Sequence, residues 1–138
     1  MEILRITNIL RLDYRCTTED VTIGGVTIPK DTTIVNLLTE VLKGSHWENA
    51  NTFNPDRFLA GSSLCPTDER FIPFLMGRRV CPGRNLASKQ LFLYFTRIIQ
   101  LFDVKLEVEG VLPDDTPVHG VITTPRLFKL RFCNRNTK

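Results

Sequence analysis

Histidine and tryptophan are scarce in this 138-residue sequence, which contains two histidines and one tryptophan. Its four cysteines lie far apart, and none belongs to a C-x-x-C pair, so a zinc site is not indicated. No run approaches the roughly 18 consecutive apolar residues of a membrane-spanning helix. The first residues also lack the charged, apolar and small-residue zones of a signal peptide. We expect no targeting signal in these residues and, without one, reduced thiols rather than disulfides.

The overall composition is that of one globular domain. Hydrophobic residues make up 42% and charged residues 24% of the chain, which is the ordinary range and shows no signature of disorder. The net charge is +3, and the lysines and arginines are dispersed rather than gathered into one tract. A nucleic-acid-binding surface is therefore not indicated.

The first part of the chain predicts a helix followed by short strands. Apolar residues at helical spacing predict a helix over residues 1–10. Two β-branched runs, Val21–Ile23 and Val26–Ile28, flank Gly24-Gly25 and predict a hairpin with a tight turn. The sequence then predicts a third strand over residues 32–35 and a short helix over residues 37–42.

A long polar stretch, residues 43–70, separates these elements from the rest of the chain. Its few aromatic residues, Trp47, Phe53 and Phe58, are expected to anchor a long loop, and loops of this length are usually functional. Apolar residues then recur at helical spacing and predict a helix over residues 82–101 that packs well on one face. The remaining residues predict short strands at 104–108, 120–123 and 127–132.

Cys81 lies where a glycine- and arginine-rich loop meets the long predicted helix. Pro82 suits the first turn of that helix, which places Cys81 beside its N-terminus. The positive end of the helix dipole and the neighbouring Arg78 and Arg79 favour a thiolate over a thiol. Most single cysteines in such positions are structural, because cysteine is among the most buried residues. The spacing of the residues around Cys81, however, favours a functional role for this cysteine.

The loop has the form F-x-x-G-x-R-x-C-x-G, set by Phe74, Gly77, Arg79, Cys81 and Gly83. It resembles the haem-binding loop of the cytochrome P-450 superfamily, a group of haem-thiolate monooxygenases. Further motifs agree in order and spacing. They are the E-x-x-R motif of the family's K helix at Glu2-Ile3-Leu4-Arg5, the meander motif at Phe53 to Phe58, and the family's L helix after Cys81.

The resemblance covers nearly the whole chain and is strongest to animal microsomal members. It implies an α+β fold made of the C-terminal part of the family's domain, so that residues 1–138 form a haem-binding portion of that domain. It also implies that Cys81 supplies the thiolate ligand to haem iron. The other implied haem contacts are Arg79 and Arg15 to propionates, Phe74 against the porphyrin, and Gly77 and Gly83 where the loop passes close to the ring.

The resemblance further implies that Glu2, Arg5 and Arg57 form a structural triad that fixes the loop carrying Cys81. Taken alone, a Glu-Arg pair three residues apart is usually a weak surface contact. Residues after Arg5 and near position 120 resemble positions that line the family's substrate pocket. These are Ile9, Leu10, Gly120, Val121 and Ile122.

The implied activity is insertion of one atom of O2 into an apolar organic substrate. The implied partner is an electron donor, such as an NADPH-dependent reductase, that meets Arg78, Arg84 and Lys89, although these residues are equally compatible with an ordinary solvated helix face. Full-length relatives are expected in the endoplasmic reticulum membrane, through an N-terminal anchor that these residues do not include. No nucleic-acid partner is expected.

Several features depart from the family pattern. Arg11 stands where the family usually has proline and the segment is about one residue short, Asp56 replaces the commoner glutamate of the meander, and Arg84 follows the glycine where glutamate is common. The chain is also much shorter than family members and lacks the helix carrying their acid-alcohol pair. We therefore expect a fragment that is inactive when isolated.

Alternative interpretations remain at this point. The chain is alternatively a truncated, non-catalytic fragment that acts at most as a haem-binding or interaction module. A thiol enzyme using Cys81 lacks a well-placed histidine base, since His46 and His119 lie in polar loops and are expected at the surface or in hydrogen bonds. The other cysteines, Cys16, Cys65 and Cys133, are interpreted as structural.

Overall fold

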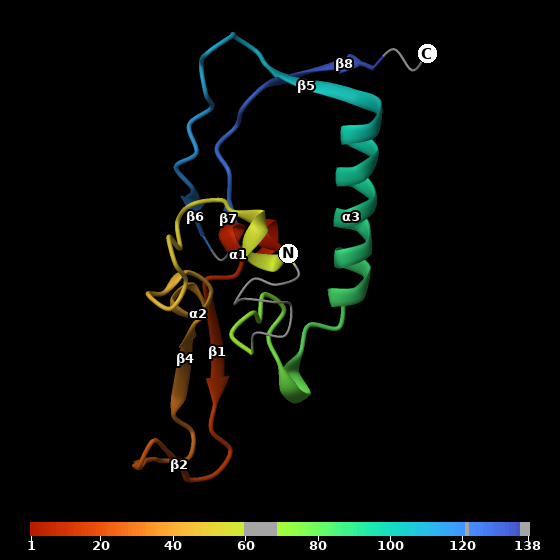
Figure 1. Ribbon diagram of the computed structural model, residues 1–138. Helices are drawn as coiled ribbons and strands as arrows, with labels where there is room; N and C mark the ends of the chain where they lie inside the picture. The colour runs from red at the N-terminus through yellow and green to blue at the C-terminus, as the bar shows by residue number, and fades with distance from the viewer. Residues whose placement is uncertain (60–68, 121, 136–138) are drawn as a thin grey trace. The chain divides into compact units, whose positions relative to one another are not determined.

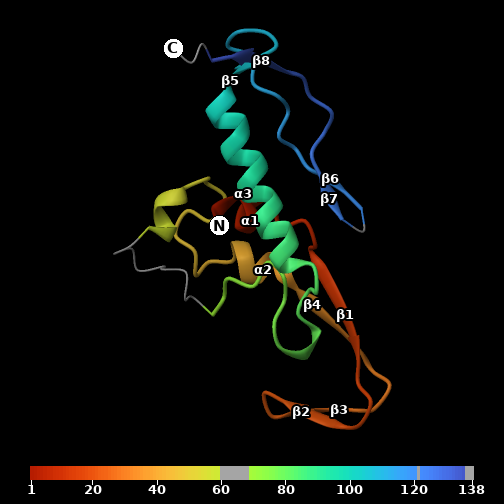
Figure 2. The ribbon, with the colours of Figure 1, turned by 90° about the vertical axis from the view of Figure 1, so that its right-hand side faces the viewer.

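The protein is described by a computed structural model that covers residues 1–59, 69–120 and 122–135. The chain divides into two compact units. Figures 1 and 2 show the helices and strands along the chain, coloured by residue number. The first unit contains Met1–Pro73 and His119–Thr123, and the second contains Phe74–Val118 and Thr124–Lys138. Two predictions from the sequence concern residues outside these ranges, namely Cys65 as a structural cysteine and Val121 as a pocket residue.

The first unit begins with helix α1 (Glu2–Thr7), which is shorter than predicted. The helix ends because Asn8 adopts a left-handed conformation with φ of 40° and ψ of 61°, a conformation that asparagine tolerates better than most residues. The Asn8 amide then donates a hydrogen bond of 2.7 Å to the Thr39 hydroxyl. The expectation of a helix over residues 1–10 is therefore wrong after Thr7, although the apolar spacing continues.

Two antiparallel strand pairs follow. Strands β2 (Val21–Ile23) and β3 (Val26–Ile28) form the predicted hairpin, and Gly24 and Gly25 take φ values of 58° and 82° in its turn. Strand β4 (Thr33–Leu37) does not join this hairpin. It pairs with β1 (Leu12–Cys16), a strand that the sequence analysis missed.

The first unit closes with helix α2 (Leu38–Lys43) and the short 3₁₀ helix η1 (Pro55–Phe58), which lies in the long polar stretch. The buried apolar residues of the described chain are few. They are Leu38, Leu42 and Trp47. The buried polar residues outnumber them, and they are Glu2, Arg5, Asn8, Asp13, Thr17 and Arg57. The interior of this unit is therefore held by charged and polar contacts as much as by apolar ones.

The second unit is built around helix α3 (Arg84–Leu101), preceded by the 3₁₀ helix η2 (Gly77–Arg79). The helix starts two residues later than predicted, with Gly83 at its N-cap, so Pro82 is not in its first turn. Pro82 lies instead in a turn in which the Cys81 carbonyl accepts the Arg84 N–H at 3.2 Å. Proline suits this turn because its ring fixes φ and its missing N–H is not needed.

The tail of the chain forms short strands, as predicted, with shifted limits. Strand β5 (Phe102–Leu106) follows α3 directly and pairs antiparallel with β8 (Leu130–Asn134). Strands β6 (Val118–His119) and β7 (Thr123–Thr124) form a separate small ribbon. Gly120 and Ile122 lie between these two strands, so the expected strand over residues 120–123 is wrong at its start.

Helix α3 also contradicts the expectation of a well-packed face, because none of its residues is buried. Phe92 is 68% exposed and Leu86 is 63% exposed. An apolar stripe on a helix is buried only when another layer covers it. In the described part of the second unit, the main structure that could cover the helix is the β5–β8 pair. Strand β5 continues from the end of the helix instead of lying along its face.

Candidate functional site

Cys81 lies at the end of a closed loop whose first residue is Phe74. The backbone N–H of Cys81 donates to the Phe74 carbonyl at 2.9 Å, and the N–H of Val80 donates to the Gly77 carbonyl at 3.2 Å. Gly77 has φ of 66°, a value that glycine reaches without strain. A Cβ added at Gly77 would meet no atom within 4 Å. The positive φ therefore explains the glycine at this position, and the space beside it is open.

Leu75 is a member of this loop that the sequence analysis did not single out. Its φ is 63°, although leucine is not a residue that favours the left-handed region. Such positions cost about 1–2 kcal/mol and tend to gather at functional sites. No sequence signal marks this position, because a leucine next to a phenylalanine is ordinary in an apolar segment.

The sulfur of Cys81 is a free thiol on a partly exposed side chain. An ideal Cβ at Gly83 would lie 3.9 Å from this sulfur, which is an ordinary contact distance. Gly83 therefore keeps one side of the sulfur open without being sterically required. Within the described residues no group of three or more histidine, cysteine or acidic side chains could hold a metal ion. Residues 74–83 contain no histidine or acidic residue, so Cys81 is the one side chain of this loop that can supply a thiolate to a soft metal ion.

Arg79 belongs to η2, two residues before Cys81, and its side chain is exposed. It makes no ion pair with any residue in the described ranges, so its guanidinium fork is available to an external carboxylate. Phe74 is half-buried at the start of the loop. A free thiol, an available guanidinium, open space at Gly77 and an aromatic side chain together fit a flat, apolar, metal-centred group with carboxylate edges.

Arg15 belongs to β1 in the first unit, apart in the chain from the loop residues of the second unit. Its Nη1 lies 2.7 Å from Asp13 Oδ1 and also donates to the Tyr14 carbonyl at 2.9 Å. Its side chain remains 33% exposed. Arg15 is thus held by Asp13 through Nη1, and its side chain is only partly buried.

Glu2, Arg5 and Arg57 form a buried charged cluster in the first unit. Arg5 donates to both Glu2 oxygens, from Nε at 2.8 Å and from Nη2 at 2.8 Å. Arg57 Nε donates to Glu2 Oε1 at 3.2 Å. The three side chains are 0 to 5% exposed. The structure therefore brings together residues that are 52 to 55 positions apart in sequence.

Backbone groups complete this cluster. The Asn54 N–H donates to Glu2 Oε1 at 3.1 Å, Arg5 Nη1 donates to the Leu42 carbonyl at 2.9 Å, and Arg57 Nη1 donates to the Glu48 carbonyl at 3.0 Å. Burial acts to raise the pKa of Glu2, but the hydrogen bonds from Arg5 and Asn54 and the charges of both arginines outweigh it and hold this pKa below its usual value. Glu2 therefore remains ionised.

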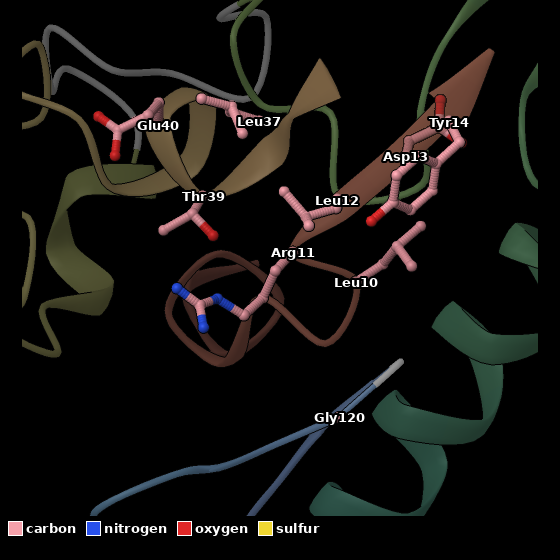
Figure 3. A pocket seen from close by; sticks show the side chains of 9 residues that line it. All are labelled: Leu10, Arg11, Leu12, Asp13, Tyr14, Leu37, Thr39, Glu40 and Gly120. Carbon is pink, nitrogen blue, oxygen red and sulfur yellow. The ribbon is translucent and has the colours of Figure 1, made fainter. Parts of the chain in front are cut away.

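The first unit also contains a hollow of about 720 Å³ beside β1 (Figure 3). Figure 3 shows the Glu40 carboxylate pointing away from the leucine side chains. The residues that line it are Leu10, Arg11, Leu12, Asp13, Tyr14, Leu37, Thr39, Glu40 and Gly120. Of the positions that resemble substrate-lining ones, Leu10 and Gly120 line this hollow. Ile9 does not, but its carbonyl accepts the Thr123 N–H at 2.8 Å and thereby joins the two segments.

Comparison with known proteins assigns the chain to a family. The sequence pattern that defines Cytochrome P450 matches residues 1–132. The chain belongs to the cytochrome P450 family. It is 34% identical to the farnesoate epoxidase of Bombyx mori, over 99% of this chain and 28% of that protein. It is 37% identical to cytochrome P450 2D28 of Mesocricetus auratus, over 94% of this chain and 26% of that protein.

The solved P450 structures agree with this assignment. A solved structure of a zebra fish cytochrome P450 with abiraterone matches with a TM-score of 0.86 and 31% identity, covering 98% of this chain and 32% of that chain. The predicted α+β class and P450 fold are thus confirmed. The chain spans about a quarter to a third of the length of these relatives. Across the described ranges, no helix has the length and apolar character needed to cross a membrane.

Proposed function

We propose that residues 1–138 form the haem-binding C-terminal portion of a P450 monooxygenase domain, with Cys81 as the axial thiolate ligand. The observation that carries this proposal is the free thiol of Cys81 in a chain of this family. This thiol lies on a loop that is closed by the hydrogen bond from the Cys81 N–H to the Phe74 carbonyl. Haem, when bound, supplies the activation of O2 for insertion of one oxygen atom into an apolar substrate. The chain's residues supply the ligand, the orientation and the surroundings.

The neighbours of Cys81 have distinct proposed roles. Arg79 pairs with a haem propionate, because its guanidinium is exposed and makes no ion pair with the described residues. Arg15 is the second propionate partner. Phe74 packs against the ring beside the sulfur and limits water there. Gly77 and Gly83 let the backbone approach the ring, since Gly77 has open space at its missing Cβ.

The cluster of Glu2, Arg5 and Arg57 has a structural role in this proposal. It ties α1 to η1, and η1 precedes the cysteine loop in the chain. Its burial makes it costly to disturb, because removing Glu2 would leave two buried guanidinium groups facing each other. The cluster is therefore proposed to fix the segment that leads to Cys81.

The substrate class and electron donor follow from family membership and from exposed residues. Leu10, Leu12 and Leu37, which line the hollow together with charged and polar residues, support an apolar organic substrate. Arg78, Arg84 and Lys89 are exposed near Cys81 in the chain and support an electron donor with an acidic docking surface, such as an NADPH-dependent reductase. Full-length relatives are proposed to act at the endoplasmic reticulum membrane.

We expect the 138 residues alone to bind haem without turning over substrate. None of residues 74–83 is buried, and α3 has no buried residue. A haem held here would be open to water, and a site that does not exclude water would favour side reactions over substrate oxidation.

The reduced carbon-monoxide difference spectrum of the haem-supplemented chain tests the ligand assignment. The wild-type chain should give a thiolate-type Soret band, and Cys81→Ser should lose it. Cys133→Ser is the matched control, because Cys133 is also a free cysteine and lies on β8. A band that survives Cys81→Ser, or that disappears in Cys133→Ser, would contradict the proposal.

A further inference from the structure

Trp47 makes a contact with the charged cluster that the family motifs do not include. Its side chain is 2% exposed, and the guanidinium carbon of Arg5 lies 5.2 Å from the centre of its ring. The ring edge is fixed independently, because Nε1 donates to the Val41 carbonyl at 2.9 Å. The indole is thus held so that its negative face receives the Arg5 cation.

The burial of Arg5 explains why this contact matters. Its guanidinium is fully buried and pairs with the Glu2 carboxylate. A buried cation is strongly unfavourable unless its surroundings compensate the charge and satisfy its hydrogen bonds. Two bonds to Glu2, one to the Leu42 carbonyl and the face of Trp47 together surround Arg5. The ring face therefore helps to keep Arg5 charged and in place.

Trp47 also begins a row of aromatic contacts in the first unit that ends at Phe71. Its ring centre lies 6.0 Å from that of Phe58 in η1, and Phe58 lies 5.0 Å from Phe71 in an edge-to-face arrangement. Phe71 is three residues before Phe74, whose carbonyl accepts the Cys81 N–H. The row connects the buried Arg5 to the segment from which the loop starts.

We propose that Trp47 is a positioning residue for the cysteine loop. The face of its ring holds Arg5 within the charged cluster. Its ring also packs against Phe58, and Phe58 packs against Phe71, so the position of Trp47 constrains Phe71, three residues before the loop begins. The consequence for haem binding rests on the proposed function of Cys81. The contact with Arg5 and the effect on the loop are properties of the chain itself.

Fluorinated tryptophans test the contact with Arg5. Trp47 is the single tryptophan of the chain, so biosynthetic incorporation changes this position alone. Each added fluorine withdraws electron density from the ring face with little change of shape, which weakens attraction to a cation. The folding equilibrium constant should fall stepwise with fluorine number, by about tenfold across the series. A folding constant independent of fluorine number would overturn the cation–π contact.

The labelling rate of Cys81 by a thiol reagent tests the effect on the loop without haem. The background variant carries Cys16→Ser, Cys65→Ser and Cys133→Ser, so that Cys81 alone reacts. Trp47→Leu should raise the labelling rate several-fold. Trp47→Phe keeps an aromatic face and should give a labelling rate close to that of wild type. Phe53→Leu is the matched control, because Phe53 is an aromatic residue of the same stretch that is 55% exposed.

An unchanged labelling rate in Trp47→Leu, with circular dichroism showing a folded chain, would overturn the positioning role. If Trp47→Leu does not fold, the Trp47→Phe rate and the fluorine series decide the question. Haem retention then separates this inference from the proposed function. If the wild-type chain takes up no haem, the proposed haem-binding function is contradicted. The labelling rates of Cys81 and the folding constants of the fluorinated chains would still decide the role of Trp47. If haem binds, Trp47→Leu should lose it several-fold faster than Phe53→Leu.

Discussion

At the scale of single residues, Glu2 is the acceptor on which the buried cluster depends. Its carboxylate accepts from Arg5, Arg57 and the Asn54 backbone, and it is 2% exposed. Hydrogen bonds to a buried charge are strong, and their loss leaves the partners unpaired. We therefore expect Glu2 to contribute strongly to the stability of the first unit.

Replacing Glu2 by glutamine should lower the free energy of unfolding by about 3–5 kcal/mol, because the buried Arg5 and Arg57 guanidinium groups lose a charged acceptor that both share. Urea unfolding followed by circular dichroism measures the change. Glu19→Gln is the control, since Glu19 is exposed and should change stability by less than about 0.5 kcal/mol. Equal effects of the two substitutions would show that Glu2 is not buried in solution.

The pH dependence of stability should follow Glu2 as well. The pKa of Glu2 in the folded chain lies below its ordinary value of 4.5, so the unfolded chain binds more protons in this range. The contribution of Glu2 is fully present above pH 4.5 and is lost as the pH falls through the lowered folded pKa. Urea midpoints measured from pH 6 downward, at about half-unit steps, test this linkage.

The difference between wild type and Glu2→Gln isolates the contribution of this one group. The stability gap should be constant above pH 4.5 and should narrow below it, because protonated Glu2 resembles glutamine. A gap that stays constant down to the acid unfolding limit would contradict the assignment of a lowered pKa to Glu2.

At the scale of elements, the C-terminal end of α2 organises the cluster. Its carbonyls at Val41 and Leu42 accept from Trp47 and Arg5, and the Gly44 N–H donates to the Glu40 carbonyl at 2.9 Å. This end must keep its backbone position for both bonds to persist.

Gly44→Ala should therefore lower the free energy of unfolding by about 1–3 kcal/mol. An added Cβ would collide with the Glu40 backbone oxygen, which cannot move without distorting the end of α2. Gly120→Ala is the matched control, because its added Cβ would lie 3.5 Å from the Ile122 carbonyl, an ordinary contact. Thermal unfolding compares the two. Similar losses in both variants would contradict a steric role specific to Gly44.

At the scale of the whole molecule, apolar surface is unevenly distributed. The buried apolar residues of the described chain lie in the first unit, whereas every residue of α3 is at least partly exposed. Large exposed apolar patches mark surfaces that bind other groups or associate with copies of themselves. The 138-residue chain should accordingly bind hydrophobic dyes while folded.

Phe92→Ser tests this distribution, since Phe92 is 68% exposed on α3. It should change the free energy of unfolding by less than about 0.5 kcal/mol and should reduce fluorescence of the dye ANS in native buffer. Leu42→Ala is the contrasting variant, because Leu42 is 1% exposed and should cost about 2–5 kcal/mol. A large loss of stability in Phe92→Ser would show that this face of α3 is covered in solution.

Local patterns in the sequence predicted most of the elements. The β2–β3 hairpin follows from Gly24-Gly25 between β-branched runs, and α2 and α3 follow from apolar spacing. Strand β1 was missed because Asp13 and Arg15 obscure its alternation. Only the pairing with β4 shows that Asp13 is buried, held by Arg15 and by Asn36.

The sequence alone determined the family and the cysteine loop, because five spaced residues around Cys81 are local information that the chain carries in order. Only the tertiary structure decided which distant groups meet. It placed Asn54, Leu42 and Trp47 around Glu2 and Arg5, and it showed that no residue of α3 is buried among the described residues. The reason is physical: burial and charge compensation depend on neighbours brought together by folding, and spacing along the chain does not specify them.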